Sequence, residues 1–265
     1  MKHGPDNPNA EGPVAFDAAT FGYGGDAEAV AGVSAVLRAG RVTALIGPNA
    51  AGKTTLLRLA LGQVRPGSGS VALHGRPAAS WDAGERARRV AYVPQRGSAA
   101  FGFSARRVVA MGRHAWGDTE HVGEALRRVG LHGEADRPVA ELSGGQQQRV
   151  WLARAWAQSR GAGGADPAEA SVVLADEPTS GQDLGHAHAS LGLLRELAGE
   201  GRAVLAVLHG LDEAARWADE VWLMHGGQLV AAGPREAVLV PGVLGPAFGV
   251  TLEAVAGGAA WVVAD

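Results

Sequence analysis

The segment Gly47-Pro48-Asn49-Ala50-Ala51-Gly52-Lys53-Thr54 fits the pattern GxxxxGK[ST] and follows the apolar run Val42–Ile46. This order predicts a strand, a tight loop whose backbone N–H groups surround an anion, and a helix that begins beside that anion. Lys53 would reach the β- and γ-phosphates of a nucleotide, and the Thr54 hydroxyl would bind Mg²⁺. A nucleotide-phosphate site is therefore expected, the alternative being a chance match in a chain with 40 glycines.

The composition is that of an ordinary globular protein. The chain has 265 residues and is 46% hydrophobic, which is ample for a packed core. It contains no cysteine, which excludes disulfides, thiolate zinc sites and cysteine nucleophiles. The net charge of −3 gives no electrostatic footprint for nucleic acid, so no nucleic-acid partner is expected. Residues 1–12 lack the apolar core of a signal peptide and are predicted to be a disordered tail.

One stretch, residues 237–252, is uncharged throughout and approaches the length of a membrane span. It contains prolines and glycines that would break a lipid-exposed helix: Pro241, Gly242, Gly245, Pro246 and Gly249. We therefore expect this segment to pack against the protein rather than to cross a bilayer.

Apolar patterning predicts an alternation of strands and helices. Strands are expected at residues 14–23, 30–37, 42–46, 71–73, 90–93, 172–176, 203–208, 221–224 and 228–232. Helices are expected at residues 53–61 and 184–197, in a short stretch that starts at Pro234, and repeatedly within residues 96–158. That last region is rich in arginine, which is typical of a solvated helix face or of a docking surface: Arg96, Arg106, Arg107, Arg113, Arg127 and Arg128.

Two further patterns gain meaning beside a phosphate loop. Ser143 precedes Gly144, Gly145 and Gln146, so it is an N-cap candidate and the helix start is a second anion site; in isolation it is only a loop and a cap. The strand at 172–176 ends in Asp176 and Glu177, which could merely mark a strand reaching the surface. Next to a phosphate loop, we expect Asp176 to hold Mg²⁺ and Glu177 to polarise the attacking water.

The order of these motifs, with Gln95 after one strand and His209 after another, resembles the ATP-binding cassette (ABC) ATPases of transporters. The resemblance covers about residues 13–265. It implies an α/β P-loop NTPase with a RecA-like mixed sheet core, an antiparallel β subdomain, and a helical subdomain inserted at about residues 96–158. ATP and Mg²⁺ are the implied cofactors.

The resemblance also implies roles for single residues. Tyr23 stacks on adenine, and the phosphate loop extends to Thr55. Gln95 senses Mg²⁺ and the membrane partner, and His209 is the switch histidine beside the catalytic Glu177. Nucleotide held by a second copy of the chain is contacted by Ser143, Gly144, Gly145 and Gln146. Asp183 belongs to the loop after the acidic pair.

Such cassettes act as head-to-tail homodimers, in which each ATP lies between Lys53 of one chain and Ser143 of the other. The resemblance further implies permease subunits, an indirect substrate-binding protein and a place on the cytoplasmic face of the membrane. Residues 101–113, together with the connection at 159–170 and the tail at 243–250, are similar to the cassettes of importers for iron–siderophore complexes, heme and cobalamin, and Gly112-Arg113 is the most suggestive part.

Other functions stay open at this point. They are an ATPase of another transporter, a non-transport ATPase acting on nucleic acid, and a catalytically silent regulatory cassette. The second would call for heptad arms, tandem cassettes or a basic face, and the third is opposed by intact Lys53, Glu177 and His209.

Four residues depart from the family pattern. Ala50 stands where glycine is usual, Gly181-Gln182 replaces Ala-Leu, and Gly210 replaces an acidic residue after the histidine. None removes a phosphate, metal or water ligand, so an active ATPase is expected. If residue 50 needs a positive φ, alanine should cost about 1 kcal/mol relative to glycine.

Overall fold

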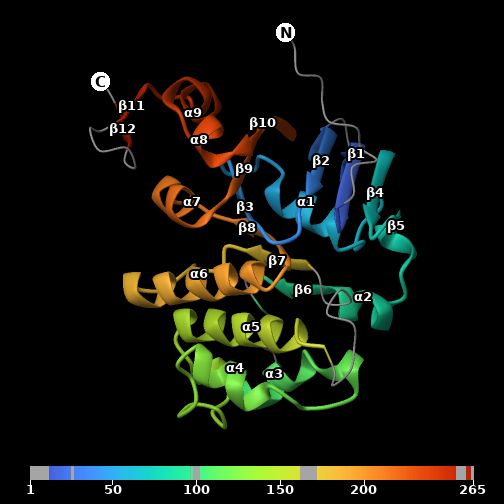
Figure 1. Cartoon of the computed structure of the whole chain (residues 1–265), viewed down its shortest axis with the longest axis vertical. Helices are drawn as coiled ribbons and strands as arrows, with labels where there is room; N and C mark the ends of the chain where they lie inside the picture. The colour runs from blue at the N-terminus through green and yellow to red at the C-terminus, as the bar shows by residue number, and fades with distance from the viewer. Residues whose placement is uncertain are drawn as a thin grey trace.

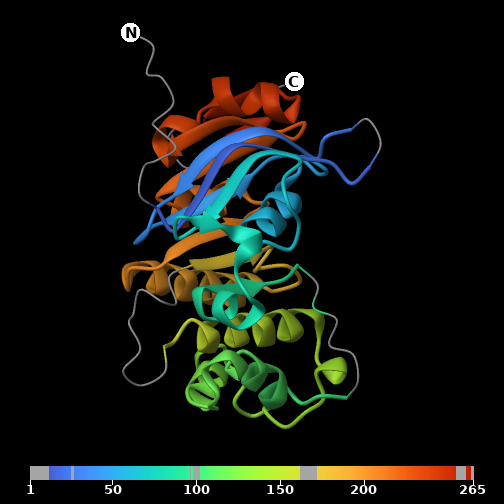
Figure 2. The same cartoon turned by 90° about the vertical axis from the view of Figure 1, so that its right-hand side faces the viewer.

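The computed structural model describes residues 12–24, 27–95, 97, 102–161, 172–254 and 261–263. Within these ranges the strands form a six-stranded sheet, a four-stranded sheet and a two-stranded hairpin. Figures 1 and 2 show the two larger sheets close together at one end and a group of helices at the other. The predicted tail, apart from Gly12, and residues 162–170 lie outside the described part.

The larger sheet places the ends of its central strands at one edge. Its order is β10 (Gln228–Pro234), β9 (Glu220–His225), β3 (Val42–Ile46), β8 (Ala203–Val207), β7 (Val172–Asp176) and β6 (Val90–Val93). All neighbours are parallel except β10, which runs antiparallel to β9. Leu45 pairs with Val207, which in turn pairs with Asp176, so the segments after β3, β7 and β8 emerge together.

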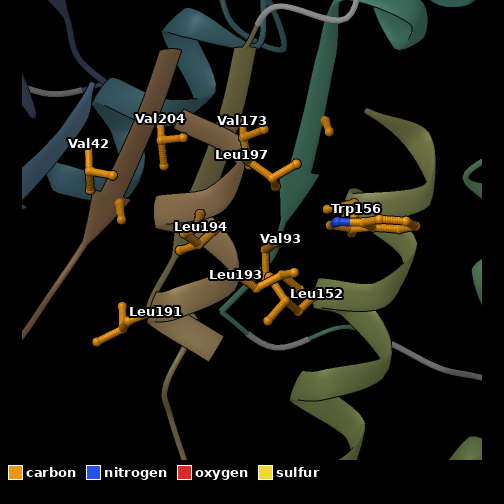
Figure 3. Packing of buried hydrophobic residues seen from close by; sticks show 14 of the residues in the cluster. Val42, Val93, Leu152, Trp156, Val173, Leu191, Leu193, Leu194, Leu197 and Val204 are labelled. Carbon is orange, nitrogen blue, oxygen red and sulfur yellow. The ribbon is translucent and has the colours of Figure 1, made fainter. Parts of the chain in front are cut away.

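Both faces of this sheet are covered, which explains its continuous apolar strands. Leu45, Leu174 and Leu205 face one cluster, together with Leu56 of α1 (Lys53–Ala60). The alternate strand residues face a second cluster with α5 (Gly144–Gln158) and α6 (Leu184–Gly199). Figure 3 shows the α6 leucines between the strands and α5, with these labelled residues: Val42, Val173, Val204, Leu191, Leu193, Leu194, Leu197, Leu152 and Trp156. Each such burial stabilises the fold by about 1.5–3 kcal/mol.

The four-stranded sheet is antiparallel and shares a core with α1. Its order is β2 (Val30–Leu37), β1 (Val14–Phe21), β4 (Ser68–Leu73) and β5 (Arg76–Pro77). A short η1 (Ala78–Ser80) leads to α2 (Ala83–Arg89), whose N-cap Asp82 accepts a hydrogen bond from Glu85 N at 2.8 Å. The sequence patterns predicted β1, β2 and the end of β4 but missed the two-residue β5. They also missed α2, because this helix buries none of its residues and so shows no apolar stripe.

Helices fill most of the region between β6 and β7. They are α3 (Ala105–Met111), η2 (His114–Trp116), α4 (Val122–Arg128), η3 (Val139–Glu141) and α5, grouped beyond α6 in Figure 1. Arg96 lies outside the described residues. Most of the arginines are exposed, but Arg113 is completely buried, so for this residue the prediction of a solvated or docking surface is wrong.

The segment after β8 also differs from expectation at two points. The helix α7 (Leu211–Trp217) was not predicted, since Ala214 is its one buried residue and no polar side chain caps it. Pro234 is the last residue of β10, so the short helix α8 begins at Arg235 (Arg235–Val238) rather than at the proline.

The apolar C-terminal segment packs against the protein, as predicted. The helix α9 (Pro241–Phe248) contains Pro246 and buries Leu244 and Ala247. A hairpin of β11 (Leu252–Ala254) and β12 (Trp261–Val263) follows. In the part of the chain that is described, no helix has both the length and the apolar character needed to cross a bilayer.

Candidate nucleotide site

The loop between β3 and α1 requires unusual backbone geometry. Gly47 and Gly52 have φ values of 145° and 99°, and a Cβ atom at either position would lie 2.1 Å from a backbone oxygen, of Met224 and Ala29 respectively. Ala50 has a φ of 61°, in the left-handed region that favours glycine. The expected strain at this departure from the family pattern is therefore present.

Lys53 places its charge at the centre of this loop. Its Nζ atom donates hydrogen bonds to the carbonyl oxygens of Gly47 at 2.7 Å and Pro48 at 2.8 Å. Burial lowers the pKa of Lys53, while the carboxylates of Glu177 and Asp176 oppose that shift. The loop thus curls around a partly desolvated ammonium group, which is suited to bind an anion.

Asp176, the last residue of β7, is a carboxylate almost removed from water. It is 1% exposed, and burial raises its pKa, opposed by a hydrogen bond from the Thr54 hydroxyl. Its Oδ1 atom is buried and has no hydrogen-bond partner among the described residues. A buried carboxylate oxygen without a partner is unfavourable in the free protein. It would gain a partner if a cation bound beside Thr54.

Glu177 is held from two sides. Its Oε1 atom lies 2.7 Å from Nε2 of His209, the contact expected of a histidine that acts beside Glu177. Its backbone has a φ of 51°, and its carbonyl accepts a hydrogen bond from Nε2 of Gln148 at 3.2 Å. The same Gln148 nitrogen donates to Pro94 O at 3.0 Å, so it ties the segment before Gln95 to the end of β7.

The Lys53 loop, Glu177 and His209 line one cavity of about 570 Å³, whereas Gly47, Pro48 and Asp176 are not among its lining residues. Most of the residues predicted for phosphate, metal and water chemistry line it, together with Ala29: Asn49, Ala50, Ala51, Gly52, Lys53, Thr54, Thr55, Gln95, Glu177 and His209. The structure therefore brings together segments that are more than 100 residues apart in the sequence.

Tyr23 lies beside this cavity but does not line it. Its ring is 60% exposed and makes an edge contact with Phe21 at 4.9 Å between centroids. Its hydroxyl accepts a hydrogen bond from Arg58 Nη1 at 2.7 Å and lies 3.3 Å from Thr55 Oγ1. The α1 helix thus fixes the ring in an exposed position next to the phosphate loop.

The predicted residues of the second anion site also lie outside the cavity lining. Ser143 caps α5 in a full capping box: its hydroxyl accepts from Gln146 N at 3.3 Å, and its own N–H donates to Gln146 Oε1 at 2.9 Å. A Cβ atom on Gly145 would lie 2.5 Å from Gly181 O, so these two glycine-containing turns touch closely. The chain by itself does not bring Ser143 to the cavity around Lys53.

The turn that contains Asp183 accommodates its departure from the family pattern. Gly181 has a φ of 70°, which glycine adopts readily. Gln182 donates from Nε2 to Pro178 O at 2.8 Å and accepts from the Ser190 hydroxyl at 2.8 Å. Asp183 caps α6 through a hydrogen bond from His186 N at 2.9 Å. The glutamine is therefore fixed by hydrogen bonds within its own chain.

Three residues of the site were missed from the sequence. Ala29 contributes a backbone oxygen close to Gly52, Arg58 holds Tyr23, and Gln148 joins two loops. Gln148 lies one helical turn before the buried Leu152, a spacing that could have marked it as the inward-facing member of the run 146–148. No comparable pattern marks Ala29.

The site combines the strand β3, a glycine-containing phosphate loop with a central lysine, and an acidic pair at the end of β7, two places from β3 in the sheet. These features define a P-loop nucleotide-binding protein. A family model described as ABC transporter matches residues 30–180. The chain therefore belongs to the ABC transporter family, as its ATP-binding ATPase component, and the predicted resemblance is confirmed.

Two curated relatives are ATP-binding proteins of import systems. A hemin import ATP-binding protein of Streptomyces coelicolor is 42% identical over 229 residues, covering 84% of this chain and 78% of that protein. A cobalamin import ATP-binding protein of Halobacterium salinarum is 41% identical over 224 residues, covering 82% of this chain and 54% of that protein.

Solved structures share the fold. A metal-chelate type ABC transporter in an inward-facing conformation matches with a TM-score of 0.75 at 26% identity, covering 91% of both chains. A dimeric ATP-binding cassette bound to ADP and Pi matches with a TM-score of 0.73 at 22% identity, covering 84% of this chain and 98% of that one. The predicted α/β fold with a mixed sheet core is confirmed.

Proposed function

We propose that the chain hydrolyses ATP in the cavity around Lys53 and so powers a membrane importer for heme, cobalamin or an iron–siderophore complex. The observation that carries the hydrolytic part is the meeting of the Lys53 loop, the buried Asp176 and the Glu177–His209 pair at one edge of the sheet. The names of the curated relatives support the choice of cargo.

Magnesium fits the acidic end of the cavity. The Asp176 Oδ1 atom is buried without a partner, and the Thr54 hydroxyl lies beside the same carboxylate. Oxygen donors of this kind suit Mg²⁺. Thr54 and Asp176, with Gln95 at the rim of the cavity, would hold the ion, which when bound offsets the charge of the β- and γ-phosphates.

Other residues at the cavity bind the phosphates, activate the attacking water and contact adenine. The backbone N–H groups of the loop and the Lys53 ammonium bind and orient the phosphates. The 2.7 Å contact with Nε2 of His209 occupies Oε1 of Glu177, which leaves Oε2 to accept a proton from the attacking water. The water oxygen then bonds to the γ-phosphorus as the bond to the β-phosphate oxygen breaks, which yields ADP and phosphate. Tyr23, exposed beside the loop, offers its ring to adenine.

The proposed second copy of the chain is inferred from a nucleotide site that lacks Ser143 in the single chain. Ser143 and its two glycines lie outside the cavity of their own chain, so we propose that they contact nucleotide bound to a second copy, with Gln146 and Asp183 beside them. A cassette of the same fold is dimeric. The dimer would dock on permease subunits at the cytoplasmic face of the membrane and respond through them to a substrate-binding protein.

Replacing Glu177 with glutamine tests the catalytic proposal. We expect ATP binding to persist while turnover falls by about 10²–10⁴-fold, the usual scale for losing a general base. Steady-state phosphate release should be slow, and size-exclusion chromatography with ATP should show a dimer. Glu236→Gln, at an exposed acid on α8, is the matched control. Undiminished hydrolysis in Glu177→Gln would contradict the assignment.

Replacing Ser143 with arginine tests the arrangement between copies. We expect hydrolysis to be abolished and the ATP affinity of the monomer to stay close to wild type, because the affected nucleotide belongs to the other chain. Nucleotide titration under monomeric conditions measures this, with Ser70→Arg on the exposed part of β4 as control. An equal loss of monomer affinity would argue for a site within one chain.

The cargo calls for the complete transporter. The chain would be co-purified with its permease, and ATPase stimulation would be measured with heme, cobalamin or a ferric siderophore presented by a binding protein. Stimulation by none of the three would overturn the cargo proposal and leave the catalytic one intact.

A further inference from the structure

Gly210, which follows His209, begins α7 without any side chain to cap it. The backbone N–H of Gly210 instead donates a hydrogen bond to the carboxylate of Glu213, three residues further on. This carboxylate folds back over the glycine, since a Cβ atom on Gly210 would lie 3.3 Å from Cγ and 3.6 Å from Oε2 of Glu213. A Cβ atom at residue 210 would therefore touch the Glu213 side chain, and a longer side chain there would crowd it.

The same carboxylate reaches a second loop. Glu213 accepts a hydrogen bond from the Thr179 hydroxyl, and it lies close enough to His209 for their charges to interact. Thr179 is in the turn after β7, where Ser180 N donates to the carbonyl oxygen of Glu177 at 3.1 Å. Burial raises the pKa of Glu213, and the two hydrogen bonds and His209 oppose that shift. One carboxylate thus joins the loop of His209 to the turn of Glu177.

We propose that Glu213 is a positioning residue for ATP hydrolysis, which holds the His209 loop against the Glu177–Thr179 turn and so maintains the 2.7 Å contact between His209 and Glu177. The inference rests on the proposed function, because it assumes that this contact serves the reaction. The proposal also accounts for Gly210. An acidic residue is usual at position 210 but is absent here, and the Glu213 carboxylate lies over the glycine instead.

A capping role alone is the competing explanation. A glutamate at the third position of a helix that accepts the N-cap N–H stabilises the helix start without any part in catalysis. The two roles differ in what they change. Loss of a cap lowers the melting temperature, whereas loss of positioning lowers kcat at unchanged KM for ATP, and only while His209 is present.

The test compares Glu213→Ala and Glu213→Gln in the full chain, each alone and combined with His209→Ala. Misplacing a catalytic group is costly to rate, so we expect Glu213→Ala to lower kcat by about tenfold or more with KM for ATP changed by less than about twofold. Glu213→Gln, which keeps an acceptor oxygen, should retain most of the activity. In the His209→Ala background, Glu213→Ala should have no further effect. Asp212→Ala, at the exposed neighbouring acid of the same helix, is the matched control.

A second variant covers the case in which Glu213→Ala folds poorly. Gly210→Asp should lower kcat because its side chain crowds Glu213, and combining it with Glu213→Ala should restore activity by supplying a carboxylate from residue 210. Equal losses with and without His209, or a lower melting temperature with unchanged kcat, would overturn the inference. Full activity of His209→Ala would instead overturn the proposed catalytic site itself.

Discussion

Asp176 and Arg113 are both charged groups removed from water, at 1% and 0% exposure, yet their surroundings differ. Arg113 donates to both carboxylate oxygens of Asp118 at 2.8 Å and to the carbonyl oxygens of Ala157 and Arg160. Asp176 keeps one buried oxygen without a partner among the described residues. A buried charge is unfavourable unless compensated. The compensated one belongs to the fold, and the uncompensated one is available to a ligand.

Two residues at the cavity also have an unusual backbone conformation. Ala50 and Glu177, both at the cavity, have φ values of 61° and 51°, which residues with a side chain adopt at a cost. The segment around Arg113 has a φ of −90° at Arg113 itself and continues into the short η2 helix. The conformation is not confined to the cavity, since Ala18, His74 and His121 have φ values of 45°, 48° and 63°.

Removing the uncompensated charge gives the largest expected effect. Asp176→Asn should lower ATP hydrolysis by about 10²–10³-fold, the scale for losing a group that stabilises developing charge. It should also stabilise the free protein at neutral pH by about 1 kcal/mol. Burial raises the pKa of Asp176, so its contribution to stability falls as the pH rises from its ordinary value of 3.8 through its folded pKa.

Denaturant unfolding at several pH values, with phosphate release in parallel, checks both parts. Asp17→Asn, at an exposed acid on β1, is the control. A destabilised Asp176→Asn protein would show that the carboxylate is already compensated and would remove the distinction from Arg113.

Removing the compensated charge should act on stability alone. Arg113→Met is expected to lower the free energy of unfolding by about 3 kcal/mol, because it leaves buried carbonyls and a partly buried carboxylate unpaired. Hydrogen bonds from Arg113 lower the pKa of Asp118, so that carboxylate stabilises the fold above its ordinary value of 3.8 and loses this effect as the pH falls through its folded pKa.

The variant should therefore lose less stability than the wild type on acidification. Chemical unfolding between pH 7 and pH 3 measures this. Arg106→Met, which removes an exposed partner of Asp136 in the same helical region, should change little. A comparable loss from both variants would mean that burial of Arg113 contributes nothing specific.

The smallest expected effect concerns the strained loop. Ala50→Gly should stabilise the protein by about 1 kcal/mol or less, because glycine relieves the left-handed backbone but loses more entropy on folding. Ala51→Gly, at a buried neighbour, should destabilise it. Thermal unfolding of the two variants gives the comparison, and destabilisation by both would show that Ala50 is unstrained.

Local sequence patterns were sufficient for much of the fold. The GxxxxGK[ST] segment, the apolar runs of β3, β7 and β8, and the capping sequence at Ser143 each carry their geometry within a few residues. The helix α2 was missed because it buries none of its residues, and hydrophobic periodicity is the main signal for a helix. The helix α7 has only seven residues, of which Ala214 alone is fully buried.

Contacts between distant segments were decided by the tertiary structure. The sequence identified Asp176, Glu177 and the Lys53 loop as candidates, because each stands at the end of a buried strand with the residue types that phosphate chemistry needs. The role of His209 was implied by the family resemblance. That Arg113 is buried, that Gln148 joins two loops, and that Glu213 reaches Thr179 depends on packing between elements far apart in the chain. A side chain's partner is fixed by the direction in which its element faces, and only the assembled core determines that direction.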